Sequence, residues 1–217
     1  MSSFDRHREA VLGSLMPELT RLGFTFHRPS QRFVKRGPKG VVYFYQILFS
    51  HSPPFIRVDV HISIRLDAVE KIFHRTSRYE KKYQSETPTM GGSLDVITGN
   101  PELKMLLDLE SGPQQAKSLL FSQTMMTFYE EWYSRFSQIE NIDRELNDYP
   151  NQDTPNRPMP WLRCTTGIIV AKLVARPNYN LLVSVYTQTM QGFSNGFYWP
   201  RFEALLIDLE RNFDDFE

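Results

Sequence analysis

FIRVDVHISIRL, from Phe55 to Leu66, is the stretch that decides the fold of this chain. From Ile56 onwards, apolar and polar residues alternate along it without interruption. Because successive side chains of a β-strand point to opposite faces of the sheet, the pattern predicts one long strand with an apolar face and a charged face. The apolar residues are Ile56, Val58, Val60, Ile62, Ile64 and Leu66. We expect them to lie at the centre of the core.

Three segments before this strand are also rich in aromatic and β-branched residues, which favours strands. Proline and glycine separate them, and Pro53-Pro54 leads into the long strand. The predicted strands are 24–28, 32–36, 41–51 and 55–66. Four consecutive strands with short connections predict an antiparallel meander.

Helical periodicity predicts a helix on each side of this meander. The first covers residues 4–22, where Pro17 is expected to kink or divide it. The second covers 67–84. Residues 94–109 then favour a second hairpin around Gly99-Asn100-Pro101, with a helix as the alternative.

From Pro113 onwards the periodicity is mostly helical. Helices are predicted over 113–136, 137–147, 165–175, 181–190 (with a strand as the alternative) and 200–213. Strands followed by helices indicate an α+β fold: an antiparallel meander sheet in the N-terminal half, packed with an N-terminal helix and a mostly helical C-terminal half. We divide the chain into a helix-plus-sheet region, 1–110, and a helical region, 111–217, sharing one core.

Composition limits the classes of function. Lysine plus arginine (25) equals aspartate plus glutamate (25), so no overall field attracts nucleic acid or an anionic membrane. Cys164 is the only cysteine, which excludes an intrachain disulfide and a thiolate metal cluster. Residues 4–9 are charged where a signal peptide is apolar, and no apolar run reaches the ~20 residues needed to span a membrane. We therefore predict a cytoplasmic protein without membrane contact.

The sequence contains no complete motif of the common enzyme classes considered below. Gly192-Phe193-Ser194-Asn195-Gly196 matches G-x-S-x-G, but a hydrolase needs a histidine after the serine, and the last histidine is His74. No dinucleotide-binding or phosphate-binding glycine motif occurs, and the histidines lack metal-ligand spacing. We expect no cofactor and no metal.

The charged face of the long strand is the first candidate binding face, with Arg57, Asp59, His61 and Arg65. Asp59, His61 and Ser63 are also the residue types of a catalytic triad. However, alternate residues on one strand lie in a row ~6.6 Å apart, whereas a triad must converge on one point. A solvated strand face explains these residues more simply.

A second candidate is a basic patch, Arg32, Lys35, Arg36 and Lys39, next to the aromatic strand 41–51. Basic residues interleaved with aromatic ones are typical of single-stranded nucleic-acid binding. The ordinary alternative is a solvated charged turn.

Residues 177–200 contain no charged side chain. The simplest explanation is burial in the core of the chain itself. The functional alternative is an interface with a second copy of the chain, anchored by aromatic residues.

Leu22-Gly23-Phe24, Arg28, the strand with Phe33, Lys35 and Arg36, and a later strand with Gln46 and Phe49-Ser50 resemble a group of bacterial proteins built on a domain of unknown function. The resemblance covers residues 4–66. It implies an opening helix, a long strand pair and closing helices, and a role as an accessory or immunity-type binding protein. It brings no catalytic residues.

Our hypothesis from the sequence is a non-enzymatic protein that binds another protein, whose identity is unknown. The alternative is single-stranded nucleic-acid binding through the basic patch. An enzyme using Asp59 and His61 comes third.

Overall fold

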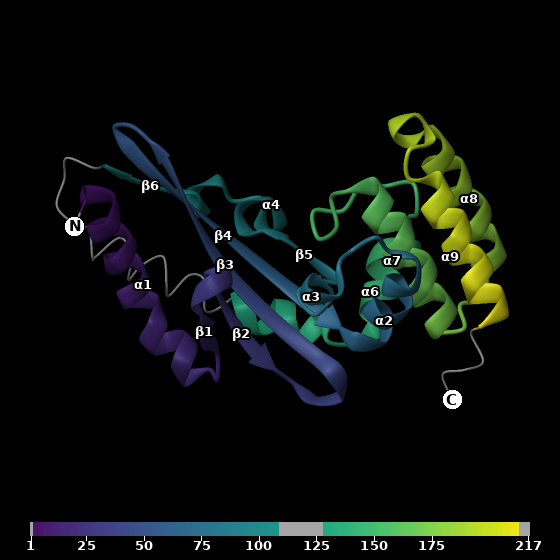
Figure 1. Ribbon diagram of the computed structural model, residues 1–217, viewed down its shortest axis with the longest axis horizontal. Helices are drawn as coiled ribbons and strands as arrows, with labels where there is room; N and C mark the ends of the chain where they lie inside the picture. Colours follow the sequence, from purple (N-terminus) through teal and green to yellow (C-terminus); the bar gives the residue numbers. More distant parts are fainter. Residues whose placement is uncertain (1, 109–127, 213–217) are drawn as a thin grey trace. The chain divides into compact units, whose positions relative to one another are not determined.

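The computed structural model describes residues 2–108 and 128–212 and has the predicted α+β architecture (Figure 1). An N-terminal helix and an antiparallel sheet occupy the first half of the chain, and helices occupy most of the second half. The contacts within the chain define two compact units. The first consists of 1–63 and 92–134, and the second of 64–91 and 135–217.

The first unit opens with helix α1, Ser3–Arg21. A capping box starts it: the Ser2 hydroxyl accepts a hydrogen bond from the Asp5 backbone N–H at 3.0 Å, and the Asp5 carboxylate accepts one from the Ser2 backbone. The helix continues as one element through Pro17, so the expected division does not occur. Its inner face buries Val11, Leu15 and Leu19.

The sheet has six strands within the described residues, in the order β1-β2-β3-β4-β5, with β6 pairing with β4. The first four are β1 Thr25–His27, β2 Arg32–Arg36, β3 Val41–Ser52 and β4 Phe55–Leu66. Thus β2 and β4 have the bounds that the sequence predicts. No member of the apolar face of β4 is more than 6% exposed, which confirms that this face belongs to the core.

The second predicted hairpin, 94–109, is wrong in its first half. After β5, Met90–Ser93, residues Leu94–Thr98 form the short helix α4. Gly99, at φ +66°, ends this helix in the left-handed conformation that glycine adopts without strain. A 3₁₀ turn follows, and β6, Met105–Asp108, then pairs antiparallel with the beginning of β4.

The second unit begins with α2, Asp67–Thr76, and α3, Lys81–Gln84. The single helix predicted over 67–84 is therefore interrupted, because Ser77 has an extended backbone. Among the described residues, helices α6 Ile139–Asn147, α7 Pro160–Leu173, α8 Tyr179–Gly192 and α9 Trp199–Arg211 follow in this unit.

Helix α7 is the centre of the second unit. It packs against α2, α6, α8 and α9, and every residue from Arg163 to Ala171 is buried. The helices predicted over 181–190 and 200–213 are confirmed as α8 and α9. Of the helix predicted over 113–136, residues 128–136 are helical and 113–127 lie outside the described residues.

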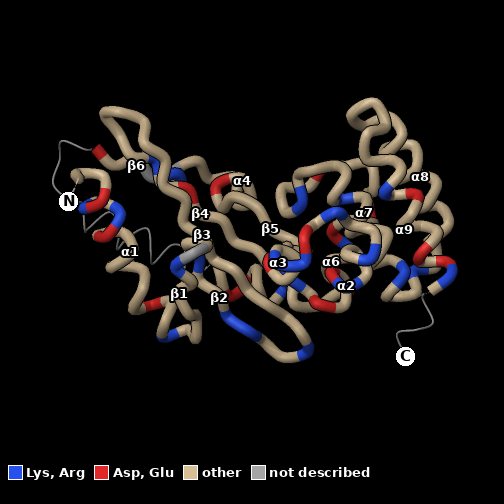
Figure 2. The backbone as a smooth tube through the Cα atoms, viewed as in Figure 1, with Lys and Arg blue, Asp and Glu red and all other residues tan. Residues whose placement is uncertain are grey.

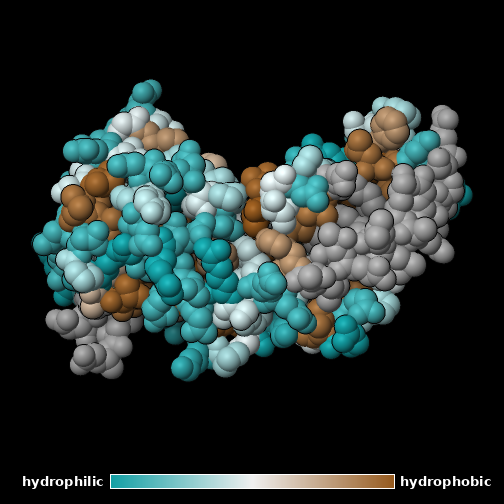
Figure 3. Space-filling model, turned by 180° about the vertical axis from the view of Figure 1, so that it is seen from behind, coloured by the Kyte–Doolittle hydropathy of each residue, from teal (hydrophilic) through white to brown (hydrophobic). Residues whose placement is uncertain are grey.

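No helix among the described residues combines the length and apolar character needed to cross a membrane. Viewed from behind, the described surface shows hydrophobic residues in several separate patches among hydrophilic ones (Figure 3). Acidic and basic residues are interspersed along the chain (Figure 2).

Candidate functional site

The exposed part of the predicted binding face lies in the first unit, on β4 and β6. Arg57 stands directly opposite Leu106 in the register of these strands. Residues directly opposite each other, and alternate residues along one strand, share a face of the sheet. Phe55, Arg57, Asp59 and Leu106 therefore share one face, which we call the strand surface.

Three members of the strand surface are open to solvent. Phe55 is 41% exposed and Leu106 is 55% exposed, and the Arg57 side chain is 46% exposed. Two large apolar side chains thus lie on the same face as an arginine, on hydrogen-bonded strands that hold them in place.

Asp59 holds the guanidinium of Arg57. The Nε of Arg57 lies 2.8 Å from a carboxylate oxygen of Asp59, and the aspartate is much less exposed than the arginine. An exposed ion pair of this kind stabilises the fold by at most about 1 kcal/mol. Its main effect is to position the arginine, whose remaining N–H groups are available for further hydrogen bonds.

His61 is the next residue on this side of β4, and it is half-buried. Burial lowers its pKa, whereas the nearby carboxylates of Asp59 and Asp95 act in the opposite direction. Asp95, on α4, forms an ion pair with Lys104 at 2.7 Å. Within the described residues His61 makes no hydrogen bond with Asp59 or Ser63, so this row of three side chains does not form a triad.

The lowered pKa of His61 leads to a test by NMR. We expect its imidazole to titrate below the ordinary value of 6.5, since burial penalises the charged ring. The folded state then binds fewer protons than the unfolded state, so the free energy of unfolding falls as the pH drops below 6.5. A pH titration of the ring resonances, assigned by their loss in His61→Gln, measures this pKa. A value above 6.5 would show that the two carboxylates outweigh burial.

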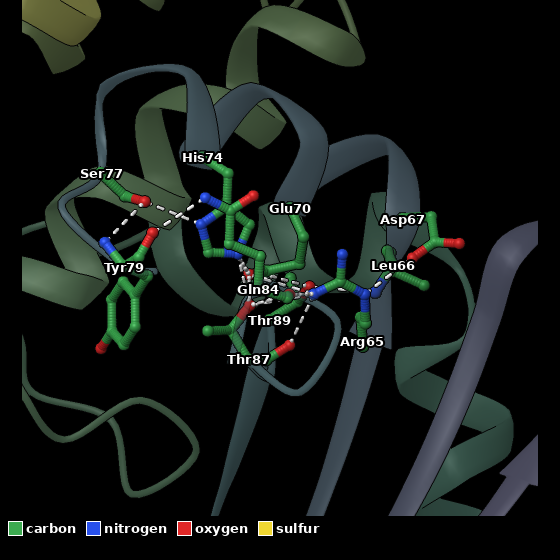
Figure 4. A network of polar contacts seen from close by, with 10 residues as sticks. All are labelled: Arg65, Leu66, Asp67, Glu70, His74, Ser77, Tyr79, Gln84, Thr87 and Thr89. Carbon is green, nitrogen blue, oxygen red and sulfur yellow. Dashed lines mark hydrogen bonds and ion pairs between the residues drawn. The ribbon is translucent and has the colours of Figure 1, made fainter. Parts of the chain in front are cut away.

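Arg65 does not belong to the strand surface, and the prediction that it lies on an exposed face is wrong. It falls in the second unit and is only 7% exposed. Its Nε lies 2.7 Å from Asp67, and its Nη1 donates to the Gln84 carbonyl at 2.6 Å and to the Thr87 hydroxyl at 2.9 Å (Figure 4). The segment after α3 covers this guanidinium.

Glu70, on α2, extends this network into the core and is 1% exposed. Its carboxylate accepts hydrogen bonds from the hydroxyls of Thr87 at 2.6 Å and Thr89 at 2.9 Å (Figure 4). The Thr89 hydroxyl in turn accepts a hydrogen bond from the Leu66 backbone N–H at 3.0 Å. His74 contacts the Thr87 hydroxyl at 2.7 Å through Nε2.

Two effects of opposite sign act on Glu70. Burial raises its pKa and is the largest influence, whereas Arg157, Thr87, Thr89 and Arg65 favour the ionised form. Arg157 is itself buried, and burial lowers its pKa. The side chains of Arg65, Glu70, Thr87 and Thr89 bond to one another, so a ligand would have to break existing contacts. We therefore assign the network a structural role.

No pattern in the sequence marked Glu70, Thr87 or Thr89 as site residues. One signal was present: Glu70 directly follows Val69 and precedes Ile72 and Phe73, which form the buried side of α2. A carboxylate next to a buried stripe needs a partner, but the sequence does not show which residues supply it.

The basic patch does not form one face. Alternation along β2 places Arg32 and Arg36 on one side of the sheet and Lys35 on the other, with Lys39 in the turn. Arg32 lies over the ring of Phe44 at 4.4 Å. Lys35 lies near two more rings, those of Phe24 and Tyr43, at 5.9 and 5.8 Å. The side chains of Arg32 and Lys35 therefore lie against the faces of aromatic rings on which nucleic-acid bases would have to stack.

The segment without charges, 177–200, is only partly buried. Helix α8 buries Leu182, Tyr186 and Met190, which confirms a core role for one side of it. Leu181 and Phe197 are exposed. An interface with a second copy therefore stays a prediction.

Comparison of the chain with protein-family models, with curated proteins and with solved structures found no match. Within the described residues there is also no group of three or more histidine, cysteine, aspartate or glutamate side chains arranged to hold a metal ion.

Proposed function

We propose that this chain binds another protein through the strand surface. The observation that carries the proposal is the arrangement of Phe55, Arg57 and Leu106, two exposed apolar side chains and an arginine on one face of paired strands. Aromatic residues and arginine are enriched at the energetic centres of protein interfaces. The role fits the accessory or immunity-type protein that the resemblance of residues 4–66 implies.

The energetics of the strand surface favour a protein partner. Fully burying Phe55 or Leu106 would contribute about 1.5–3 kcal/mol each, because apolar area leaves water. Both side chains belong to hydrogen-bonded strands, so little backbone entropy is lost on binding. Arg57, held by Asp59, supplies N–H donors for a carboxylate or carbonyl of the partner. The partner should therefore present apolar side chains next to an acceptor.

We also propose a reducing compartment such as the cytoplasm, because a chain with one cysteine cannot rely on an intrachain disulfide for its stability. The only cysteine, Cys164, is buried in α7, and burial raises the pKa of its thiol to about 12. A thiol so protonated reacts slowly, and the chain has no second cysteine to pair with it.

Photo-cross-linking in cells tests the proposed surface. A photoreactive amino acid at position 106 should cross-link a specific protein, and Arg57→Glu should abolish that cross-link because the arginine donors are lost. Position 149, an exposed tyrosine in the second unit, serves as the matched control site. Equal cross-linking from positions 106 and 149, or products containing only a second copy of the chain, would contradict the proposal.

Once the partner is known, its affinity can be measured with purified variants. Leu106→Asp should weaken binding about 30-fold or more, the effect of losing an interface anchor worth about 2 kcal/mol. Tyr149→Asp should leave the affinity unchanged. Since both side chains are exposed, both variants should fold, which circular dichroism can verify.

A further inference from the structure

A cleft of about 290 Å³ opens in the first unit between α1 and the strands β1 and β3. Its apolar wall comprises Leu12, Met16, Phe26, Ile47 and Phe49. Leu12 and Met16 are one helical turn apart and lie on the same side of α1. The volume is close to the lower limit of small-molecule pockets, about 300–1,000 Å³, so the cleft suits a small ligand.

The polar side of the cleft carries a net positive charge. Four polar residues line it: Arg8, Glu9, Arg28 and Gln31. Two arginines and one glutamate give a formal net charge of +1. The guanidinium of Arg8 forms an ion pair with the carboxylate of Glu9 at 3.3 Å, so these two charges compensate each other. The positive charge of Arg28 remains uncompensated by another residue that lines the cleft.

Arg28 is the group that can receive an anion. It is exposed, and among the described residues it makes no ion pair. Gln31 lies three residues further on, and its backbone N–H donates to the Arg28 carbonyl at 3.2 Å. This bond fixes the backbone of the short 3₁₀ turn that carries both residues, and both line the cleft.

We propose that the cleft binds a small carboxylic acid with an apolar tail. The tail lies against the apolar wall, and the carboxylate accepts hydrogen bonds from the guanidinium of Arg28 and the side-chain amide of Gln31. Arginine suits this role because its planar fork donates two parallel hydrogen bonds to a carboxylate. The site is separate from the strand surface and does not depend on the proposed function.

Calorimetry with three eight-carbon probes tests the chemistry of the ligand. We expect octanoate to bind. Octan-1-ol should bind at least roughly tenfold more weakly, because it cannot form charge-assisted hydrogen bonds with Arg28. Octylamine should bind most weakly, because its positive charge is repelled by that of Arg28. Shortening the acid should weaken binding by about fourfold per methylene removed. Equal affinity for the three probes, or no binding of octanoate, would overturn the proposal.

Two variants distinguish loss of the contact with the carboxylate from a general effect of replacing an arginine on the fold. Arg28→Gln should weaken octanoate binding roughly tenfold and leave octan-1-ol binding unchanged. Arg36→Gln, an exposed arginine at the end of β2, is the matched control and should bind octanoate like the original chain. If Arg28→Gln keeps its full octanoate affinity, the carboxylate contact is wrong.

Two further measurements define the ligand class and the site. A short peptide with a C-terminal leucine should bind more weakly than octanoate, and tighter binding of the peptide would overturn the assignment to a small acid. Leu106→Asp should bind octanoate unchanged, so failure of the protein-binding proposal and failure of this one remain distinguishable.

Discussion

Replacing Glu70 by leucine is expected to lower the free energy of unfolding by about 3–5 kcal/mol, because removing one member of a buried ionic network leaves the others uncompensated. Glu70 is the acceptor for Thr87 and Thr89, and its charge opposes those of Arg157 and Arg65. Leucine supplies neither acceptor nor charge. Urea unfolding followed by circular dichroism measures the difference.

The matched variant is Glu70→Gln, which keeps the shape and one acceptor. Burial is the largest influence on the pKa of Glu70 and penalises its charge, so exchanging the carboxylate for a neutral amide of the same shape should cost less, about 1–2 kcal/mol. If Glu70→Leu proved as stable as the original chain, the network would contribute nothing to stability.

The same pKa gives the pH dependence its sign. Because the folded-state pKa of Glu70 lies above its ordinary value of 4.5, the folded state binds more protons than the unfolded state between these two values. The contribution of this group is fully present below pH 4.5 and is lost as the pH rises through the raised pKa. The stability of the original chain relative to Glu70→Gln should therefore increase as the pH falls from 7 towards 4.5.

Replacing Gly167 by alanine is the second large effect that we expect. A Cβ at this position would lie 2.8 Å from the Tyr186 hydroxyl and 2.9 Å from the side-chain oxygen of Asn147. Neither group can move freely. Tyr186 donates to Asn147 at 2.5 Å, and the Asn147 amide donates to the Gly167 carbonyl at 3.0 Å, all within the core.

We expect Gly167→Ala to destabilise the chain by about 1–5 kcal/mol. Overpacking costs about 1–3 kcal/mol and a broken buried hydrogen bond about 1–3 kcal/mol, offset by about 1 kcal/mol of improved helix propensity. Gly192→Ala is the control in the same unit, since a Cβ there meets nothing within 4 Å. It should be neutral or slightly stabilising. A stabilised Gly167→Ala would show that the core around Tyr186 rearranges easily.

The sequence predicted β4 correctly because one local property, the alternation of apolar and polar residues, decides it. The same alternation placed Arg65 with Arg57 and Asp59, although Arg65 is buried. Strand periodicity says which side of the sheet a residue faces. It does not say that a segment some 20 residues later, with Gln84 and Thr87, folds over that side.

Short apolar runs show a second limit. Leu94–Thr98 fits a strand and a helix equally well by pattern, and Gly99 decides between them through the left-handed backbone that ends α4. Leu106 shows a third limit. It joins the strand surface only because β6 pairs with β4, and that pairing between distant segments is not encoded in either strand alone.

The division of the chain into two units has a consequence for its synthesis. Each unit is assembled from two separate segments, and residues 64–91 belong with residues 135–217. Helix α2 therefore leaves the ribosome well before α7 and α9, the helices that cover it. Until α7 and α9 have been synthesised, these helices cannot cover the apolar side chains of Val69, Ile72 and Phe73. The newly made chain should therefore be most prone to aggregate, and most in need of chaperones, while these helices are still being translated.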